Sequence, residues 1–319
     1  MSVVVAGGAG FIGSNLCKVL LEKEKKVICI DNFITGDKKN IQGFLNSSQF
    51  SFFEHDITKP LPDDIEKGQK IDAIFHLASP ASPNKNSARS YINYPLETML
   101  VNSTGTHHLL ELARKYNALF LFASSSEVYG DPQVSPQPED YFGNVNPNGV
   151  RSVYDEAKRF GEAITMAYVR KFDLDARIIR IFNTYGPNMQ PDDGRVVSNL
   201  LMQAITNQPL TIYGSGDQTR SFCYVDDMIA GIILAMFSDN TKGEVINLGN
   251  PTERTIADFA ALVQKITNTK TSLVNEPLPE DDPRQRKPDI TKAKRLLQWE
   301  PTVSVEEGLA KTFEYFKNI

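Results

Sequence analysis

The chain has 319 residues, of which 41% are hydrophobic and 23% are charged, and its formal net charge is −5. This length suits one large or two modest domains, and the composition excludes a disordered chain. The acidic balance argues against a nucleic-acid partner, because phosphate binding requires clustered Lys and Arg in excess. No stretch approaches the ~20 apolar residues of a membrane span, and no basic leader precedes an apolar run, so we expect no membrane partner and a cytoplasmic location.

The chain opens with a predicted βαβ unit. Residues 2–6 form a short β-branched run, residues 14–21 have helical apolar spacing, and residues 27–31 form a second apolar strand. Between the first strand and the helix lies the turn 7–13, Gly-Gly-Ala-Gly-Phe-Ile-Gly. Glycines at this spacing permit a tight turn and let the backbone approach a pyrophosphate at the amino end of the helix. The unit therefore predicts a dinucleotide site.

Asp31 ends the second strand of this unit. A carboxylate at that place can accept hydrogen bonds from ribose hydroxyls and repel a 2′-phosphate. The sequence therefore predicts NAD rather than NADP as the cofactor.

The following segments continue the alternation of strands and helices. Further strands are expected at 51–56, 73–77, 119–123 and 176–181, with a helix at about 95–116. This pattern predicts an α/β fold with a doubly wound parallel sheet of the Rossmann type. Ligands of such sheets lie beyond the carboxyl ends of the strands, where the following residues should line one crevice: Gly7, Asp31, Asp56, Ser79, Ser125 and Asn183.

After Pro187 the alternation becomes irregular, which predicts a smaller second unit. An apolar strand at 245–249 is expected to return to the large sheet. We therefore expect an NAD-binding domain over residues 1–185, joined again by 223–249. A smaller, interleaved C-terminal domain of residues 186–222 and 250–319 should bind the substrate.

Tyr154 and Lys158 stand four residues apart and so share one face of a predicted helix. A phenol of pKa ~10 becomes a base at neutral pH only if its phenolate is stabilised, and a pKa of ~7 requires roughly 4 kcal/mol. A fixed ammonium and a cationic cofactor beside the ring could supply that stabilisation. With Ser125 about thirty residues earlier, the pair predicts proton transfer at a site of hydride transfer.

Metal chemistry is not expected. The three cysteines, Cys17, Cys29 and Cys223, have no metal-ligand spacing, and the four histidines form no cluster. Two of the thiols fall on apolar segments, which predicts buried, reduced cysteines.

With these motifs in order, the chain resembles the extended short-chain dehydrogenase/reductases, in particular the NAD-dependent nucleotide-sugar epimerases, dehydratases and decarboxylases. The resemblance covers nearly the whole length and rests on the motifs at 7–13, 31–33, 76–83, 125–130, 154–158, 180–187 and 213–216. Within this family it is most similar to the decarboxylases of UDP-glucuronate, through the segments 76–83, 126–131, 193–199, 218–222 and 282–289.

The resemblance implies a set of site residues. Cofactor contacts are implied for Gly7, Gly10, Phe11, Ile12, Gly13, Asp31, Asn32, Asp56, Ile57, Leu77, Ala78, Ser79, Asn102, Tyr154, Lys158, Thr184 and Arg195. Contacts with the nucleotide sugar are implied for Ser125, Asn183, Val197, Tyr213, Arg220 and Arg286. Catalytic roles are implied for Tyr154, Lys158, Ser125, Ser126, Glu127 and Arg220.

The implied reaction is oxidation of the sugar at C4, loss of the C6 carboxylate as carbon dioxide, and return of the hydride, with no net redox change. In it, Glu127 would manage a proton or a water, and Arg220 would position the carboxylate or the ring. The similar 4,6-dehydratases carry Asp where this chain has Ser126, which disfavours dehydration. Homodimers of this family pair helices equivalent to 95–116 and 151–171, so a homodimer is expected.

One position departs from the decarboxylase pattern. Those enzymes carry a substrate-contacting Lys two residues before the equivalent of Asn102, and this chain has Leu100 there. Lys85 or Arg89 of the preceding, longer loop could replace that cation. Alternatively, the protein is a nucleotide-sugar 4-epimerase or C4 dehydrogenase, or an NAD-sensing binding protein without catalysis.

Overall fold

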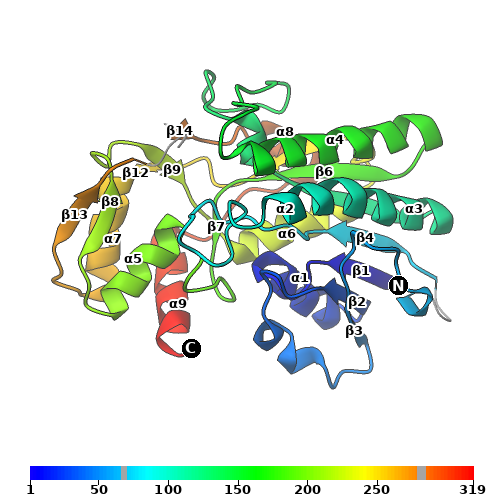
Figure 1. Ribbon diagram of the computed structural model, residues 1–319, viewed down its shortest axis with the longest axis horizontal. Coiled ribbons are helices and arrows are strands. Elements are labelled where there is room, and N and C mark those ends of the chain that lie inside the picture. Colours follow the sequence, from blue (N-terminus) through cyan, green and yellow to red (C-terminus); the bar gives the residue numbers. More distant parts are fainter. Residues whose placement is uncertain (66–69, 279–284) are drawn as a thin grey trace.

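Seven parallel strands form the main sheet of the computed structural model, which describes residues 1–65, 70–278 and 285–319. The strands are β1 (Ser2–Ala6), β2 (Lys26–Asp31), β3 (Phe50–Glu54), β4 (Ala73–His76), β5 (Leu119–Ser125), β6 (Ala176–Ile181) and β11 (Val245–Leu248). Their order is β11-β6-β5-β4-β1-β2-β3 (Figure 1). The predicted doubly wound parallel sheet is confirmed. The return of segment 245–249 to it is confirmed as well, because β11 pairs with β6.

Helices cover both faces of this sheet, which explains why its strands are almost continuously apolar. One face carries α1 (Phe11–Glu22) and α6 (Val225–Phe237). The other carries α2 (Pro95–Leu100), α3 (Thr106–Tyr116) and α4 (Ser152–Phe172) (Figure 1). The prediction of a single α-helix over 95–116 is wrong in one respect, its continuity. A π-helical turn at Val101–Gly105 separates α2 from α3.

A smaller group of elements lies beside one end of the sheet (Figure 1). Its helices are α5 (Val196–Ile205), α7 (Ile256–Thr267) and α9 (Val305–Lys317), and α8 (Thr291–Leu297) packs near β11. Its short strands are β8 (Leu210–Tyr213), β9 (Thr219–Ser221), β12 (Glu253–Thr255), β13 (Leu273–Glu276) and β14 (Gln285–Arg286). They form the sheets β12-β9-β14 and β13-β8, and β7 (Thr184–Tyr185) pairs with β10 (Cys223–Tyr224). The division into two domains stays a prediction.

Short 3-10 turns complete the fold: η1 (Lys38–Asn40), η2 (Gln42–Phe44), η3 (Asp63–Ile65) and η5 (Ser126–Tyr129). The three cysteines are buried free thiols, as predicted. Among the described residues, no helix combines the length and apolarity needed to cross a membrane. The first three residues of the segment 282–289 lie outside the described residues.

Candidate active site

A cavity of about 890 Å³ opens between the main sheet and the smaller group of elements. Most of the predicted site residues line it: Gly7, Gly10, Phe11, Ile12, Gly13, Leu77, Ser79, Ser125, Ser126, Glu127, Tyr154, Lys158, Asn183, Thr184, Arg195, Val197, Tyr213, Arg220 and Arg286. The crevice predicted beyond the strand ends is therefore present, and its volume lies in the range of cofactor and ligand sites.

Six predicted cofactor residues do not line the cavity: Asp31, Asn32, Asp56, Ile57, Ala78 and Asn102. Some of these six form hydrogen bonds that hold cavity-lining residues in place. Asn102 is fully buried and donates a hydrogen bond to Ser79 Oγ at 2.9 Å, while its own Oδ1 has no partner among the described residues. Asp56 accepts a hydrogen bond from the Thr58 amide and so caps the turn after β3.

The glycine-rich turn has a backbone that side chains would not allow. Gly7 has φ +81°, and a Cβ on Gly13 would lie 2.0 Å from the Gly7 carbonyl oxygen. The helix α1 that follows starts at Phe11 and has no side-chain cap at Gly10, so the amides of its first turn remain available. This cradle suits a pyrophosphate at the positive end of the helix.

Asp31 lies at the end of β2 and is mostly buried. One carboxylate oxygen accepts the Ala9 amide at 2.9 Å, and the other accepts the Phe33 amide at 2.8 Å. Burial raises the pKa of Asp31, while these amides oppose the shift. The carboxylate thus links the glycine turn to the loop after β2, where Thr35 reaches the cavity. The predicted contact of Asp31 with the ribose of NAD stays a prediction.

Helix α4 and strand β5 bring Tyr154, Lys158 and Ser125 together. Lys158 Nζ donates a hydrogen bond to the Ala123 carbonyl at 2.8 Å and lies 5.7 Å from the centre of the Tyr154 ring. Ser125 lies close enough to Tyr154 to lower the pKa of its phenol. The predicted pairing of Tyr154 with Lys158 on one helix face is therefore present. The packing of α4 on β5 brings this pair close to Ser125.

Burial dominates the ionisation of both groups. It raises the pKa of Tyr154 to about 12, although Ser125 opposes the shift. It lowers the pKa of Lys158 to about 7, and the carboxylate of Glu162 opposes that shift. The protein by itself therefore does not favour the phenolate, because a buried charge is poorly solvated. The remaining stabilisation would have to come from a bound cationic cofactor.

Glu127 forms the centre of a cluster of arginines. Its carboxylate accepts hydrogen bonds from Arg151 and, at 3.1 Å, from Arg286, whose side chain is 1% exposed. Burial alone would raise the pKa of Glu127, but Arg286 and Arg151 outweigh it and lower the pKa to about 2. Glu127 is thus a carboxylate at neutral pH, able to accept a proton or to orient a water. Arg220 contributes to the same positive field.

Two residues of this site were not predicted from the sequence, Arg151 and Tyr91. Tyr91 stacks on Tyr154 with ring centroids 4.9 Å apart and an interplanar angle of 9°. Arg151 precedes Tyr154 by three residues, a helical spacing that could have indicated it. No local pattern indicates Tyr91, because its contact with Tyr154 joins segments 63 positions apart.

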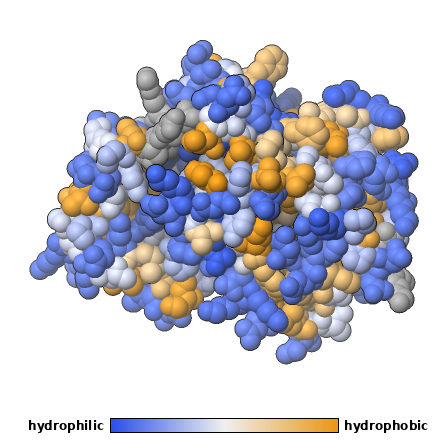
Figure 2. Space-filling view, in the orientation of Figure 1, coloured by the Kyte–Doolittle hydropathy of each residue, from blue (hydrophilic) through white to orange (hydrophobic). Residues whose placement is uncertain are grey.

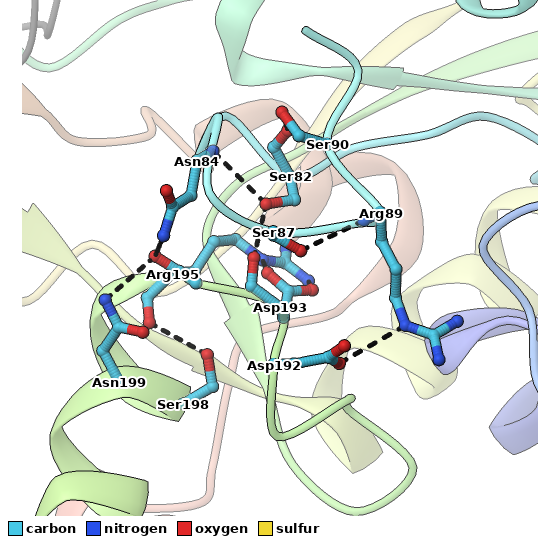
Figure 3. A network of polar contacts seen from close by, with 11 residues as sticks. Ser82, Asn84, Ser87, Arg89, Ser90, Asp192, Asp193, Arg195, Ser198 and Asn199 are labelled. Atoms are coloured by element: carbon cyan, nitrogen blue, oxygen red, sulfur yellow. Dashed lines mark hydrogen bonds and ion pairs between the residues drawn. The ribbon is translucent and has the colours of Figure 1, made fainter. Parts of the chain in front are cut away.

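The loop containing residues 82–90 closes over one side of the cavity against residues 192–199 (Figure 3). Ser82 donates a hydrogen bond to the Asp193 carbonyl, and Arg89 pairs with Asp192 at 3.3 Å. Arg89 also donates to the Thr35 carbonyl at 2.9 Å. The side chain of Arg195 forms a bidentate salt bridge with Asp193, with N–O distances of 2.6 and 2.7 Å.

Leu100 lies on the exposed side of α2, is 48% exposed and does not line the cavity. Lys85 and Arg89 do line it. Arg89 is occupied by Asp192 and by backbone carbonyls, whereas Lys85 makes no ion pair within the described part of the chain. Of the two cations considered for the role of the missing Lys, Lys85 is therefore the one with its charge available.

Comparison with known proteins agrees with this geometry. Residues 3–249 match the NAD dependent epimerase/dehydratase family. The chain is 47% identical over 318 residues to UDP-glucuronic acid decarboxylase 5 of Arabidopsis thaliana, covering 99% of this chain and 89% of the relative. It is 45% identical over 314 residues to UDP-glucuronic acid decarboxylase 1 of Danio rerio, covering 98% of this chain and 72% of the relative.

Solved structures share the whole fold. UDP-glucuronic acid 4-epimerase from Bacillus cereus, in complex with UDP-glucuronic acid and NAD, superposes with a TM-score of 0.88 at 32% identity. UDP-glucose 4-epimerase from Thermotoga maritima, with UDP-glucose, gives 0.89 at 31% identity. Both alignments cover 100% of this chain and 99% of the other. With a family match over most of its length and relatives at this identity, the chain belongs to the NAD-dependent epimerase/dehydratase family.

Proposed function

We propose that the protein converts UDP-glucuronate to UDP-xylose and carbon dioxide, with NAD as its cofactor and no net redox change. The observation that carries the proposal is the identity of 45–47% to UDP-glucuronic acid decarboxylases over at least 98% of this chain. The cavity supports it, since it joins a dinucleotide cradle to a cluster of buried arginines suited to an anionic sugar.

The residues around Tyr154 would carry the first step. Tyr154 takes the proton of the sugar 4-hydroxyl, Ser125 hydrogen-bonds the same oxygen, and the Lys158 ammonium stabilises the phenolate. NAD, when bound in the cradle of Gly7, Gly10 and Gly13, supplies the hydride acceptor and later the hydride donor for C4. The product of this step is a 4-ketone.

The 4-ketone makes the C6 carboxylate part of a β-keto acid. The C5–C6 bond breaks, carbon dioxide leaves, and the electron pair of that bond becomes an enolate. Arg286 and Arg220 would hold the departing carboxylate, because a guanidinium binds two oxygens at once, while Tyr154 and Ser125 would stay on O4, which becomes the enolate oxygen. A proton must then reach C5, and the ionised Glu127 would orient the water that brings it.

Ser126 supports decarboxylation over 4,6-dehydration. Loss of a 6-hydroxyl as water needs a positioned acid, and Ser126 has none to offer, whereas carbon dioxide leaves without one. Leu100 does not weaken the proposal, because the cations that line the cavity come from other segments. Among them, Lys85 would meet the sugar carboxylate or the diphosphate.

A 4-epimerase acting on UDP-glucuronate is the second candidate. The similarity to the Bacillus cereus 4-epimerase supports it, because that enzyme binds UDP-glucuronic acid and NAD on the same fold. The two reactions share oxidation at C4 and differ in whether carbon dioxide is lost.

Mass spectrometry of the products distinguishes these reactions. Incubation with UDP-glucuronate should give UDP-xylose, lighter than the substrate by carbon dioxide, without accumulation of NADH. A product of unchanged mass would select the epimerase, and one lighter by two hydrogens would select a C4 dehydrogenase. Absence of turnover with UDP-glucuronate, and turnover instead with another member of a panel of UDP-, GDP- and dTDP-sugars, would contradict the proposed substrate.

We also propose a homodimer formed through α2 and α4. Leu96 is 68% exposed, Met99 44% and Phe160 50%, and Leu100 belongs to the same face. Hydrophobic side chains gather over α2 and the start of α4 (Figure 2). Such a patch on packed helices suits a twofold interface.

Sedimentation tests this interface. Phe160→Glu should shift the protein from dimer to monomer, because it places a charge in an apolar contact. Phe142, 87% exposed and outside both helices, provides the matched control, and Phe142→Glu should leave the dimer intact. A wild-type monomer at micromolar concentration would contradict the proposal.

A further inference from the structure

Beneath the Tyr154–Lys158 pair lies a buried ion pair between Glu162 and Arg180 that the reaction described above does not use. The two side chains meet at 2.8 and 2.9 Å in a two-pronged contact, and they are 13% and 11% exposed. Breaking such a pair is destabilising because one charge is left without its partner in a largely buried place. Its location therefore raises the question of what it does for the site.

Tyr154, Lys158 and Glu162 follow one another at intervals of four residues, so they form a single row along α4. The row is fixed to two consecutive residues of β5. Lys158 donates to the Ala123 carbonyl at 2.8 Å, and Glu162 Oε1 accepts from Ser124 Oγ at 2.6 Å. The ammonium and the carboxylate are thus held side by side at the level of one helical turn.

Arg180, on β6, holds Glu162 from the side of the sheet. It also donates to Tyr129 Oη at 2.8 Å and to the Glu139 carbonyl at 2.9 Å. These contacts leave the orientation of the pair fixed, with the carboxylate on the helix that carries Lys158 and the guanidinium on the strand.

We propose that the Glu162–Arg180 pair is a positioning element for proton transfer, in which Glu162 keeps Lys158 protonated and Arg180 holds Glu162 in place. Lys158 is 3% exposed, so water cannot solvate its charge. Burial lowers the pKa of Lys158 to about 7, and Glu162 is the group that opposes this shift. Without a charged Lys158, the phenolate of Tyr154 loses a cation whose nitrogen lies 5.7 Å from the centre of its ring.

Other groups face the same pair, and none of them replaces Glu162. On β4, His76 is buried and its pKa is lowered to about 3 by burial and by Lys158, so it is neutral. The remaining charged or titratable side chains near Tyr154 are Glu127 on η5, Asp155 on α4, Tyr91 in the loop before α2 and Arg195 before α5. They act on the phenol rather than on the ammonium.

The inference rests on Tyr154 and Lys158 being the proton-transfer pair of the proposed function, but its test needs no substrate. The ionisation of Lys158 is followed in the NAD-loaded protein by NMR of carbon-13-labelled lysine, with the same variant carrying Lys158→Met to assign the signal. A charge removed within roughly 6–10 Å in a partly buried site moves a pKa by about one unit.

Substitutions of the two partners should shift the midpoint of the titration in opposite directions. Glu162→Gln removes a negative charge and should lower the midpoint of the titration by about one pH unit. Arg180→Gln leaves Glu162 unneutralised and should raise it by a similar amount. Glu162→Asp retains the charge and should keep the wild-type midpoint. A purely structural pair would lower the melting temperature in both variants without moving the midpoint, or would move it in the same direction in both.

A double variant covers the case in which a single variant does not fold. Glu162→Gln with Arg180→Gln leaves no lone buried charge, so it should fold more readily than either single variant. Its midpoint should still fall, by less than with Glu162→Gln alone, because Glu162 is the member that acts on Lys158. An unchanged midpoint in the double variant would overturn the inference. Turnover with UDP-glucuronate, where present, should show its pH optimum displaced in the same directions.

Discussion

The placement of Tyr154 and Lys158 depends on how closely α4 approaches β5, and Gly161 tests that approach. Gly161 is buried on α4, and a Cβ at this position would lie 2.1 Å from Cζ of Phe122 and 2.7 Å from two further ring atoms. Ordinary contact begins at 3.4 Å, so either the ring or the helix must move by more than 1 Å. The ring has no room, because His76 packs edge-on at 5.3 Å and Lys158 Nζ lies 5.1 Å from its centre.

Gly161→Ala should therefore destabilise the protein and impair turnover together. Overpacking costs about 1–3 kcal/mol, while Ala in place of Gly returns up to ~1 kcal/mol of helix propensity, so we expect a net loss of about 1–2 kcal/mol. A displacement of about 1 Å in α4 would weaken the hydrogen bond of Lys158 to Ala123, and kcat should fall on the order of 10- to 100-fold.

Urea unfolding and steady-state kinetics measure both effects. Gly43→Ala is the matched control, since a Cβ there meets nothing within 4 Å, and it should leave stability and kcat at or slightly above the wild-type values. Phe122→Leu in the Gly161→Ala background should restore part of the loss, which a double-mutant cycle would record as coupling. Equal stability and equal kcat for Gly161→Ala and Gly43→Ala would refute the reasoning.

Three further outcomes are expected. Tyr154→Phe should lower kcat by about 10²- to 10⁴-fold while the purified protein retains NAD, and a variant that stays active would remove Tyr154 from the chemistry. Glu127 has a pKa of about 2 in the folded protein against 4.5 unfolded. Its charge therefore adds about 3 kcal/mol to the free energy of unfolding above pH ~4.5, and this contribution is lost as the pH falls towards 2. In urea titrations, the difference in free energy of unfolding between wild type and Glu127→Gln should narrow over this range, and a constant difference would contradict the depressed pKa. Asp31→Asn should reduce the preference for NAD over NADP by about tenfold or more in binding titrations, because a charge that repels the 2′-phosphate is removed; an unchanged preference would place the selectivity elsewhere.

Local sequence was sufficient for the elements that are local in origin. The strand predicted at residues 2–6 has the same bounds as β1, because an apolar β-branched run that ends at a glycine turn is typical of a buried strand. The predicted helix after the turn begins three residues earlier than expected, at Phe11, because the glycine turn itself forms the amino end of α1. Spacing also predicted Tyr154 and Lys158 on one helix face, since that depends only on helical geometry.

Long-range packing decided the rest. Glu127 and Arg286 are 159 positions apart, and only the pairing of β14 with β9 brings Arg286 into the site. The π-helical turn between α2 and α3 contains Asn102, whose side chain donates a hydrogen bond to Ser79. The apolar spacing of a helix does not reveal a contact with a residue outside that helix. Leu100 was expected to affect the substrate site because of the resemblance to the decarboxylases. The structure locates it outside the cavity, and a sequence pattern alone does not show which side of α2 faces the cavity.

Transient oxidation at C4, with the hydride returned to the same carbon, is the central claim, and a deuterium label tests it most directly. UDP-glucuronate carrying deuterium at C4 should give UDP-xylose that retains the deuterium at C4, because the Tyr154 site oxidises and reduces the sugar within one cavity. Product without the label, or a 4-keto sugar released together with labelled NADH, would contradict the account.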